Sequence, residues 1–182
     1  MADGDEDRQF TFALPSPHVQ SLPETEVVEL ESILGCKLSH AAAPAIVNVG
    51  AIWVVLTLNN AVVVLDLQPD FAKLTAVERR LGITGLTVFG RYPQGDVAIK
   101  VRTFAPSCGV EENPVCGSGS GNASVAAFQW AHGLLPAGGT SYVAAQGHRV
   151  GRDGRVQVQV DSDGQVRVGG SCITCGDGRL VL

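Results

Sequence analysis

Basic residues are scarce in this sequence of 182 residues. It has 13 Lys and Arg against 18 Asp and Glu, so that the formal net charge is -5. Binding to nucleic acid or to anionic lipid depends on clustered Lys and Arg that neutralise phosphates. The charge therefore argues against nucleic acid and membrane surfaces as partners.

Aromatic residues are also few, at 5%, whereas glycine occurs 22 times. Hydrophobic residues make up 45% and charged residues 17%, which is enough apolar material for a core and excludes a disordered polyelectrolyte. Frequent valine pairs and glycines are typical of short strands and tight turns rather than of a helical bundle. We expect a soluble, globular and strand-rich protein.

The N-terminus lacks the basic start and apolar run of a signal peptide. Four acids precede the first base, Arg8. We expect an acidic, disordered tail over residues 1–9, followed by one domain over residues 10–182 in a cytoplasmic protein.

Residues 41–65 carry no charge, and a helix of this length would be long enough to cross a bilayer. Pro44 and the Asn59–Asn60 pair interrupt the run, and β-branched residues lie on both sides of the pair. We therefore predict a hairpin of two strands, over residues 46–58 and 61–67, and no membrane span.

The five cysteines are odd in number and follow no export signal, which argues against a disulfide framework. Cys172 and Cys175 have the spacing of half a zinc site or of a redox pair. Zinc needs four ligands, and no second pair lies nearby. We interpret both as strand cysteines and expect no metal.

Periodicity and turn residues predict the other elements. We expect amphipathic helices over residues 24–34 and 70–81, and strands over residues 10–14, 85–90, 96–104, 141–145, 155–160, 165–168 and 179–182. Residues 123–132 are rich in alanine and uncharged, which predicts a helix buried on all sides. Because such a helix must be enclosed, we expect an α+β fold in which a curved, mostly antiparallel sheet wraps around a central helix.

The densest cluster of Gly, Ser and Cys lies directly before this helix, within residues 107–122. Gly117, Gly119 and Gly121 let the backbone approach a ligand, and the first N–H groups of the helix point at the same loop. This arrangement favours an anion site for a small carboxylate or an enolate. A thiol at a helix N-terminus is expected to have a lowered pKa, so Cys116 is a candidate to exchange a proton with carbon or to act as a nucleophile.

Other glycine-loop motifs do not fit this cluster. The Walker A lysine is missing, the third glycine of a dinucleotide-binding loop is replaced by Ser124, and no serine has the spacing of a nucleophile elbow. A purely structural interpretation also fits the residues, namely a glycine-rich turn that caps a buried helix with Cys116 as a small core residue. Both interpretations stay open on composition alone.

The segments Arg102-Thr-Phe-Ala-Pro106 and Glu112-Asn-Pro-Val-Cys-Gly-Ser118 resemble the signature of the PhzF-like isomerases of phenazine biosynthesis. Gln146-Gly147 and Val168-Gly-Gly170 resemble the C-terminal pattern of that family, so the resemblance covers residues 10–182. It implies a diaminopimelate-epimerase-like fold, with two pseudo-symmetric halves that each wrap a sheet around a central helix and an active site between them.

The resemblance also implies site residues. Cys116, within Cys-Gly-Ser-Gly, is similar to the catalytic cysteine of related epimerases and proline racemases. Glu112, Asn113 and Ser118 are the other candidate catalytic residues; the family has an aspartate where Asn113 stands, and an amide can hydrogen-bond but cannot ionise. The predicted anion-binding residues are Gly117, Gly119, Ser120, Gly121 and Asn122.

The chain begins where the second half of typical family members begins. The resemblance implies that the first half supplies a general-base glutamate, which no residue here matches. We expect an isomerase or epimerase that moves a proton on a small carboxylate metabolite without a cofactor, as a homodimer whose second subunit completes the cleft. The alternative is an inactive ligand-binding or scaffold remnant of the same family.

Three other residues have structural interpretations. Arg102 is expected to form an ion pair that holds the loop before the cluster. His132 is placed to cap the C-terminal end of the buried helix. His148 is a candidate proton donor or a solvated loop residue.

Overall fold

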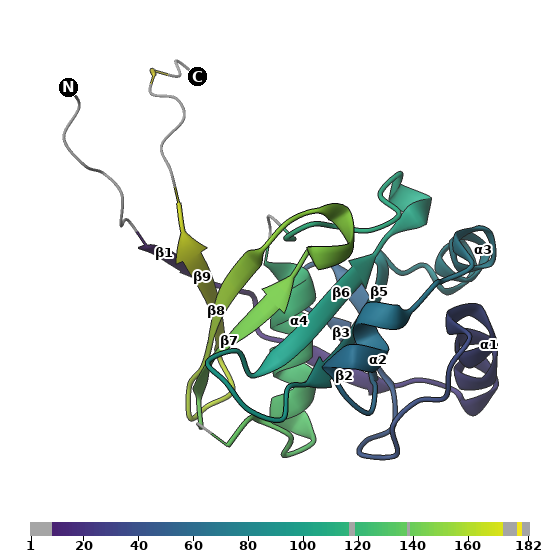
Figure 1. Ribbon diagram of the computed structural model, residues 1–182, viewed down its shortest axis with the longest axis horizontal. Coiled ribbons are helices and arrows are strands. Elements are labelled where there is room, and N and C mark those ends of the chain that lie inside the picture. The colour runs from purple at the N-terminus through teal and green to yellow at the C-terminus, as the bar shows by residue number, and fades with distance from the viewer. Residues whose placement is uncertain (1–8, 117–118, 138, 173–177, 180–182) are drawn as a thin grey trace.

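A computed structural model describes residues 9–116, 119–137, 139–172 and 178–179. These residues form one sheet of nine strands in the order β1-β9-β8-β7-β6-β5-β4-β3-β2 (Figure 1). The strands are β1 (Gln9–Ala13), β2 (His18–Ser21), β3 (Ala45–Asn48), β4 (Ile52–Thr57), β5 (Gly85–Arg91), β6 (Ile99–Phe104), β7 (Ser141–Gln146), β8 (Gly154–Val160) and β9 (Val166–Ser171). The helices are α1 (Glu24–Leu34), α2 (Ala61–Asp66), α3 (Phe71–Leu81) and α4 (Ser120–Ala131), with 3-10 turns η1 (Pro106–Cys108) and η2 (His148–Val150).

The sheet is mixed and mostly antiparallel. Only the pairs β4–β5 and β6–β7 are parallel among the described strands. A parallel pair cannot be joined by a tight turn and needs a crossover connection. Helices α2 and α3 make the first crossover and α4 makes the second.

The two faces of the sheet carry different helices. Helix α4 packs against β2, β3, β4, β5, β8 and β9, and residues 120–129 are all buried. Apolar side chains of α1, α2 and α3 pack with β4, β5 and β6 in a second core on the other face. Successive residues of β6 therefore alternate between the α4 side and the α2 side.

Side-chain caps and glycines set the ends of the predicted helices. Asp70 accepts a hydrogen bond from the Lys73 N–H at the start of α3. Gly82 ends α3 and Gly35 ends α1, both in the left-handed conformation that favours glycine. The helices predicted over residues 24–34 and 70–81 are thus confirmed.

The strand predicted over residues 61–67 is wrong, because this segment forms α2. The Asn60 side chain caps the helix and accepts hydrogen bonds from Val62 N and Val63 N. The start of α2 also lies so close to β5 that a Cβ on Gly90 would stand 2.3 Å from the Asn60 carbonyl oxygen. Capping and packing therefore override the strand preference of the valines.

The predicted hairpin lies earlier in the chain than expected. Residues 46–58 contain two strands, β3 and β4, which pair antiparallel around a turn at Gly50.

Strand β1 begins at Gln9, one residue inside the predicted tail. Residues 1–8, Cys175 and the end of the strand predicted over 179–182 lie outside the described residues. No helix in the described parts of the chain is both long and apolar enough to span a bilayer.

Helix α3 buries a carboxylate beside the loop that leads to α4. The Glu78 side chain is fully buried, and its Oε2 accepts a hydrogen bond of 2.8 Å from the Ser107 N–H. Its Oε1 has no partner within the described residues. Burial raises the pKa of Glu78, because water no longer solvates the charged form.

We expect Glu78→Gln to stabilise the protein at pH 7 by about 1 kcal/mol, or roughly 2–4 °C in Tm. Glu78 has a raised pKa in the folded state, so its contribution to stability is present at low pH and is lost as the pH rises through the folded pKa. The gain in the variant should therefore disappear below about pH 4, where Glu78 is protonated in both states. Thermal unfolding across pH 3–8 measures this, with the exposed Glu111→Gln as control. An equal Tm for the two variants at pH 7 would contradict it.

Candidate functional site

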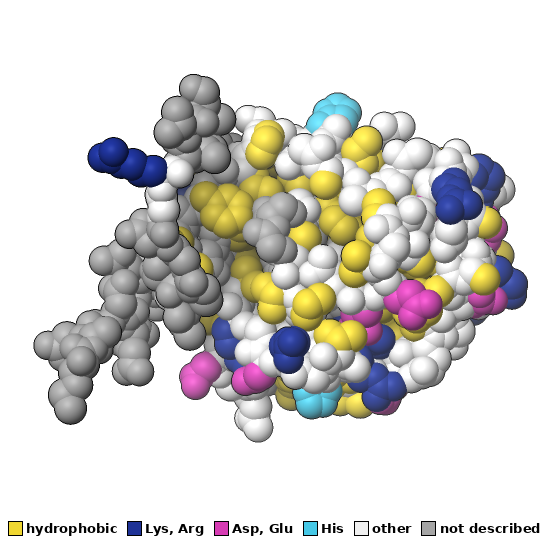
Figure 2. Space-filling model, turned by 90° about the horizontal axis from the view of Figure 1, so that it is seen from above, with side chains coloured by type: hydrophobic (Ala, Val, Ile, Leu, Met, Phe, Trp, Pro, Cys, Tyr) yellow, Lys and Arg dark blue, Asp and Glu magenta, His cyan; other side chains and the backbone are white. Residues whose placement is uncertain are grey.

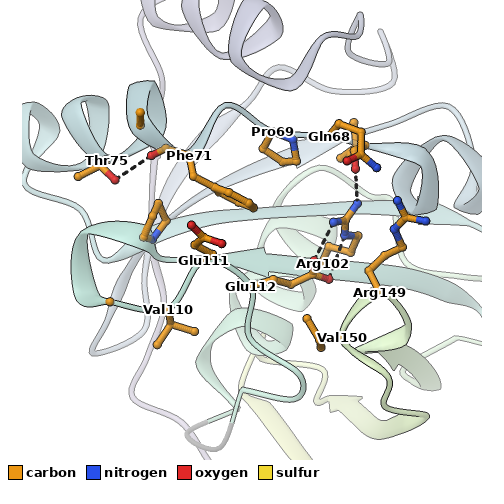
Figure 3. A pocket seen from close by; sticks show the side chains of 14 residues that line it. Gln68, Pro69, Phe71, Thr75, Arg102, Val110, Glu111, Glu112, Arg149 and Val150 are labelled. Carbon is orange, nitrogen blue, oxygen red and sulfur yellow. Dashed lines mark hydrogen bonds and ion pairs between the residues drawn. The ribbon is translucent and has the colours of Figure 1, made fainter.

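The loop from Val110 to Cys116 connects η1 to α4 and is fixed first by an ion pair. Arg102 of β6 donates from Nε and Nη2 to the Glu112 carboxylate at 3.0 and 2.7 Å. Its Nη1 donates to the carbonyls of Val64 and Leu67 at the end of α2. Figure 3 shows the Arg102 guanidinium beside the Glu112 carboxylate. The predicted ion-pair role of Arg102 is confirmed, and the same cation caps α2.

The next two residues of the loop are held through their backbone. The Asn113 N–H donates to the Thr103 carbonyl at 2.9 Å, and Gln146 Nε2 donates to the Asn113 carbonyl at 2.9 Å. The Pro114 carbonyl oxygen would stand 2.3 Å from a Cβ on Gly147. Strands β6 and β7 therefore set the path of the chain just before Cys116.

Cys116 lies where this loop meets α4, and its side chain is buried. The Cys116 Sγ is 3.5 Å from the Ser120 Oγ in the first turn of the helix. Ser120 Oγ also accepts a hydrogen bond of 3.1 Å from the Trp53 indole of β4. The structure thus brings two of the predicted site residues together.

Gly119 is the N-cap of α4 and adopts φ 66°. Its N–H donates to the Cys116 carbonyl at 2.7 Å, and its own carbonyl accepts from Ala123 N at 2.9 Å. A Cβ at this position would lie 2.3 Å from Val168 Cγ2. Glycine is therefore required here both by the backbone conformation and by the close approach of β9.

A buried amide pair links the helix to the loop. Asn122 Nδ2 donates to Gln146 Oε1 at 2.7 Å, and Gln146 in turn holds the Asn113 backbone. Asn122 is 1% exposed, and its Oδ1 has no hydrogen-bond partner within the described residues. A buried acceptor without a partner costs stability, so the bond to Gln146 positions the Asn122 side chain at an energetic cost.

A groove of about 990 Å³ lies on the other side of the sheet, and Figure 3 shows it from close by. Its lining residues come from the end of α2, α3, β6, the loop before Cys116 and η2, and they include Arg102, Glu111, Glu112 and Arg149. Cys116 and Asn122 are not among them. The structure therefore places the Glu112 carboxylate on the α2 side, apart from the Cys116 thiol at the start of α4.

The remaining predicted residues are placed as follows. Gly121 lies in the first turn of α4, where a Cβ would stand 2.8 Å from Thr103 Oγ1. Gly117 and Ser118 lie outside the described residues. His132 caps α4, with its Nδ1 2.9 Å from the Phe128 carbonyl oxygen, as predicted. His148 is exposed in η2.

Two residues of the site were not predicted to belong to it. Trp53 lies 67 residues before Ser120 along the chain, and only the parallel crossover brings it there. Gln146 belonged to the C-terminal pattern, but nothing in the sequence indicated its bond to Asn122.

The site combines a thiol with the N-terminal end of a buried helix. The first N–H groups of α4 have no carbonyl partner one turn earlier within the helix, and the dipole is positive at this end. Such an end stabilises a carboxylate or an oxyanion, while a thiolate can accept a proton and return it as the thiol. In the described ranges no group of three His, Cys, Asp or Glu side chains is arranged to hold a metal.

Comparison with known proteins gives consistent matches. A family model described as "PhzC-PhzF: Phenazine biosynthesis-like protein" matches residues 1–178. The chain is 34% identical over 185 residues to the protein named Antisense-enhancing sequence 1 of Schizosaccharomyces pombe, covering 98% of this chain and 61% of that protein. It is 30% identical over 189 residues to an uncharacterized isomerase of the same yeast, covering 95% of this chain and 97% of that protein.

Solved structures with the same fold are longer than this chain. A PhzF-family phenazine biosynthesis protein of Bacillus anthracis aligns with a TM-score of 0.72 and 17% identity, over 90% of this chain and 57% of its own. A predicted epimerase of Pseudomonas aeruginosa aligns with a TM-score of 0.71 and 23% identity, over 92% of this chain and 57% of its own. The chain thus spans a little more than half of these structures, but nearly all of the second yeast relative.

Proposed function

Because this chain belongs to the PhzC-PhzF family of phenazine biosynthesis-like proteins, we propose that it is an isomerase or epimerase that moves a proton on a small carboxylate metabolite. Proteins similar to it are named isomerases in Schizosaccharomyces pombe and Deinococcus radiodurans. In this proposal the first N–H groups of α4 hold the carboxylate. The Gly119 N–H is not one of these donors, because it donates to the Cys116 carbonyl.

The position of Cys116 is the observation that carries this proposal. Its Sγ stands 3.5 Å from Ser120 Oγ at the start of a buried helix, where a neighbouring anion would be stabilised. The thiolate takes a proton from the carbon beside the carboxylate, and the resulting enolate is held by the helix N–H groups. The proton then returns to carbon, so that the reaction is redox-neutral.

Glu112 has a different role in the proposal from the one expected from the sequence. Both of its carboxylate oxygens accept hydrogen bonds from Arg102 on the α2 side of the sheet. The carboxylate is thus already engaged, and it lies on the opposite side of the sheet from the Cys116 thiol. We therefore assign the proton transfer to Cys116, with Glu112 as a positioning residue for the loop, and Asn113 as a backbone anchor.

We further propose that a second copy completes the cleft. Each chain would then form one half of a diaminopimelate-epimerase-like assembly, with its sheet curved around α4. Phe10 and Phe12 of β1 are 54% and 46% exposed, and Phe12 Cζ lies within 3.2 Å of a Cβ placed on Gly119. Viewed from above, Figure 2 shows hydrophobic side chains gathered at the end of the molecule where α4 begins. A second copy that covers this end would bury these rings and enclose the thiol.

We expect Cys116→Ser to lower proton exchange on an accepted substrate by at least about 100-fold. The measurement is deuterium incorporation from D2O into a panel of small chiral carboxylates, followed by NMR. Cys108→Ser is the matched control, because Cys108 is an exposed thiol on η1. Exchange at the wild-type rate in Cys116→Ser would contradict the assignment of the thiol.

The native mass of the same samples, measured by sedimentation, tests the second copy. A dimer that exchanges deuterium supports the isomerase. The inactive alternative predicts that carboxylates raise the Tm of the wild-type protein by mass action but acquire no deuterium. A monomer with full exchange would contradict the need for a second subunit while leaving the role of Cys116 intact.

A further inference from the structure

Lys100 is a buried lysine on the face of the sheet opposite α4. It lies in β6, where its neighbours Ile99 and Val101 belong to the core around α4 and it points to the other side with Arg102. Lys100 is only 4% exposed. A buried ammonium group is unfavourable unless an anion or a hydrogen-bond acceptor is paired with it.

Arg102 has such partners, whereas Lys100 does not. Two residues along the same face, Arg102 binds Glu112 and the carbonyls at the end of α2. Neither a hydrogen bond nor an ion pair joins the Lys100 ammonium to any other described residue. Burial and then the like charge of Arg155 lower the pKa of Lys100, and the more weakly acting carboxylates of Asp153 and Glu112 oppose this only in part. Both effects would be offset by an anion placed between the two cations.

The strand register puts Lys100 and Arg155 in one row. Lys100 pairs with Ala145 of β7, and Ala145 pairs with Arg155 of β8. Alanine is the only side chain between the two cations in this row, so the space above it is open. The residues Lys100, Ala145 and Arg155 line one pocket of about 370 Å³.

Polar groups surround the same pocket. Tyr92, Gln94 and His148 line it from the loop after β5 and from η2. Asp153 also lines it, but it is engaged with Arg155 at the exposed rim, and Asp96 lies on the exposed loop. The pocket thus has a cationic floor at Lys100 and hydrogen-bonding groups at its walls, within the size range of small-molecule sites.

We propose that Lys100 and Arg155 bind the phosphate or carboxylate group of a small molecule in this pocket. The oxyanion lies over Ala145, where it neutralises the buried ammonium and bridges to the guanidinium of Arg155. The remaining volume accommodates a short polar body that reaches Tyr92 and His148. This site is on the opposite face of the sheet from Cys116, so it is independent of the proposed proton transfer.

Titration with inorganic phosphate and with acetate, at constant ionic strength, tests the site. Calorimetry should show binding to the wild-type protein that Lys100→Met and Arg155→Met each weaken at least tenfold. Lys37→Met is the control, because Lys37 is an exposed lysine on the loop after α1. Lys100→Met should also have a higher Tm than the wild-type protein without ligand, which separates loss of binding from loss of fold.

Amide NMR distinguishes this site from the start of α4. Binding at the proposed pocket should shift the signals of Ala145 and Arg155, and binding at the helix should shift that of Gly121. Shifts confined to Gly121, or equal affinities for Lys100→Met and Lys37→Met, would overturn the inference. Neither measurement depends on catalytic activity, so this site can be tested whether or not the proposed isomerase function is correct.

Discussion

Arg102→Met is expected to lower the free energy of unfolding by about 3–5 kcal/mol. The substitution leaves the Glu112 carboxylate, which is 7% exposed, without its partner. It also removes the donors to the carbonyls of Val64 and Leu67 at the end of α2. Urea unfolding at pH 7 measures the loss.

Two further variants separate the charge from the geometry. Arg102→Lys keeps the charge but not the bidentate contact with Glu112, so we expect an intermediate loss of unfolding free energy. Arg102→Met combined with Glu112→Met leaves no unpaired charge and should recover part of the stability. A change within 1 kcal/mol of the wild-type value for Arg102→Met alone would contradict the buried ion pair as the support of this loop.

Gly147→Ala is expected to destabilise the protein by about 2–4 kcal/mol. Gly147 has φ 90°, and a Cβ there would stand 2.3 Å from the Pro114 carbonyl oxygen, which is rigid backbone. The loop must therefore move away, and Cys116 follows two residues later. Proton exchange should fall together with stability.

Gly151→Ala provides the matched comparison for Gly147→Ala. Gly151 has φ 71° and no atom within 4 Å of the position of a Cβ. This variant carries only the cost of the left-handed backbone, about 1–2 kcal/mol, and should keep its exchange rate. If both variants lost the same stability and activity, contact with Pro114 would not be the cause.

The sequence predicted those elements whose ends carry local signals. Asp70 and Gly82 bound α3, and Gly35 ends α1, so each boundary was visible in a few residues. Helix α4 was predicted from its uncharged, alanine-rich composition. These features depend on neighbours in the chain and not on the fold around them.

Helix α2 was not predicted, because its only local signal is the Asn60 cap and its other causes lie elsewhere in the fold. Its valines favour a strand by intrinsic preference, but Arg102 caps its end and Gly90 lets its start approach β5. The parallel pairing of β4 with β5 requires a crossover at this place. Neither these two contacts of α2 nor the parallel strand pairing can be inferred from the sequence of the segment itself.

In the candidate site, too, some contacts follow from the local sequence and others depend on the tertiary fold. Cys116 and Ser120 are only four residues apart, so their contact is local in the sequence. The ion pair of Arg102 was expected from its position before the loop. The link from Gln146 to Asn122 joins the end of β7 to the first turn of α4, and this pairing could not be found without the sheet order. The side on which Glu112 lies was likewise set by tertiary structure.

The pairing of β1 with β9 has a consequence for how the chain folds. Gln9 lies opposite Ser171, so the first and last described strands complete each other's hydrogen bonds. A contact of such sequence separation slows folding, because the chain between the two strands must be ordered first. During synthesis, β1 leaves the ribosome long before β9 exists, and Phe10 and Phe12 remain on an unpaired edge throughout that time. We therefore expect the growing chain to be prone to aggregation at β1, and chaperones that bind aromatic segments to act there.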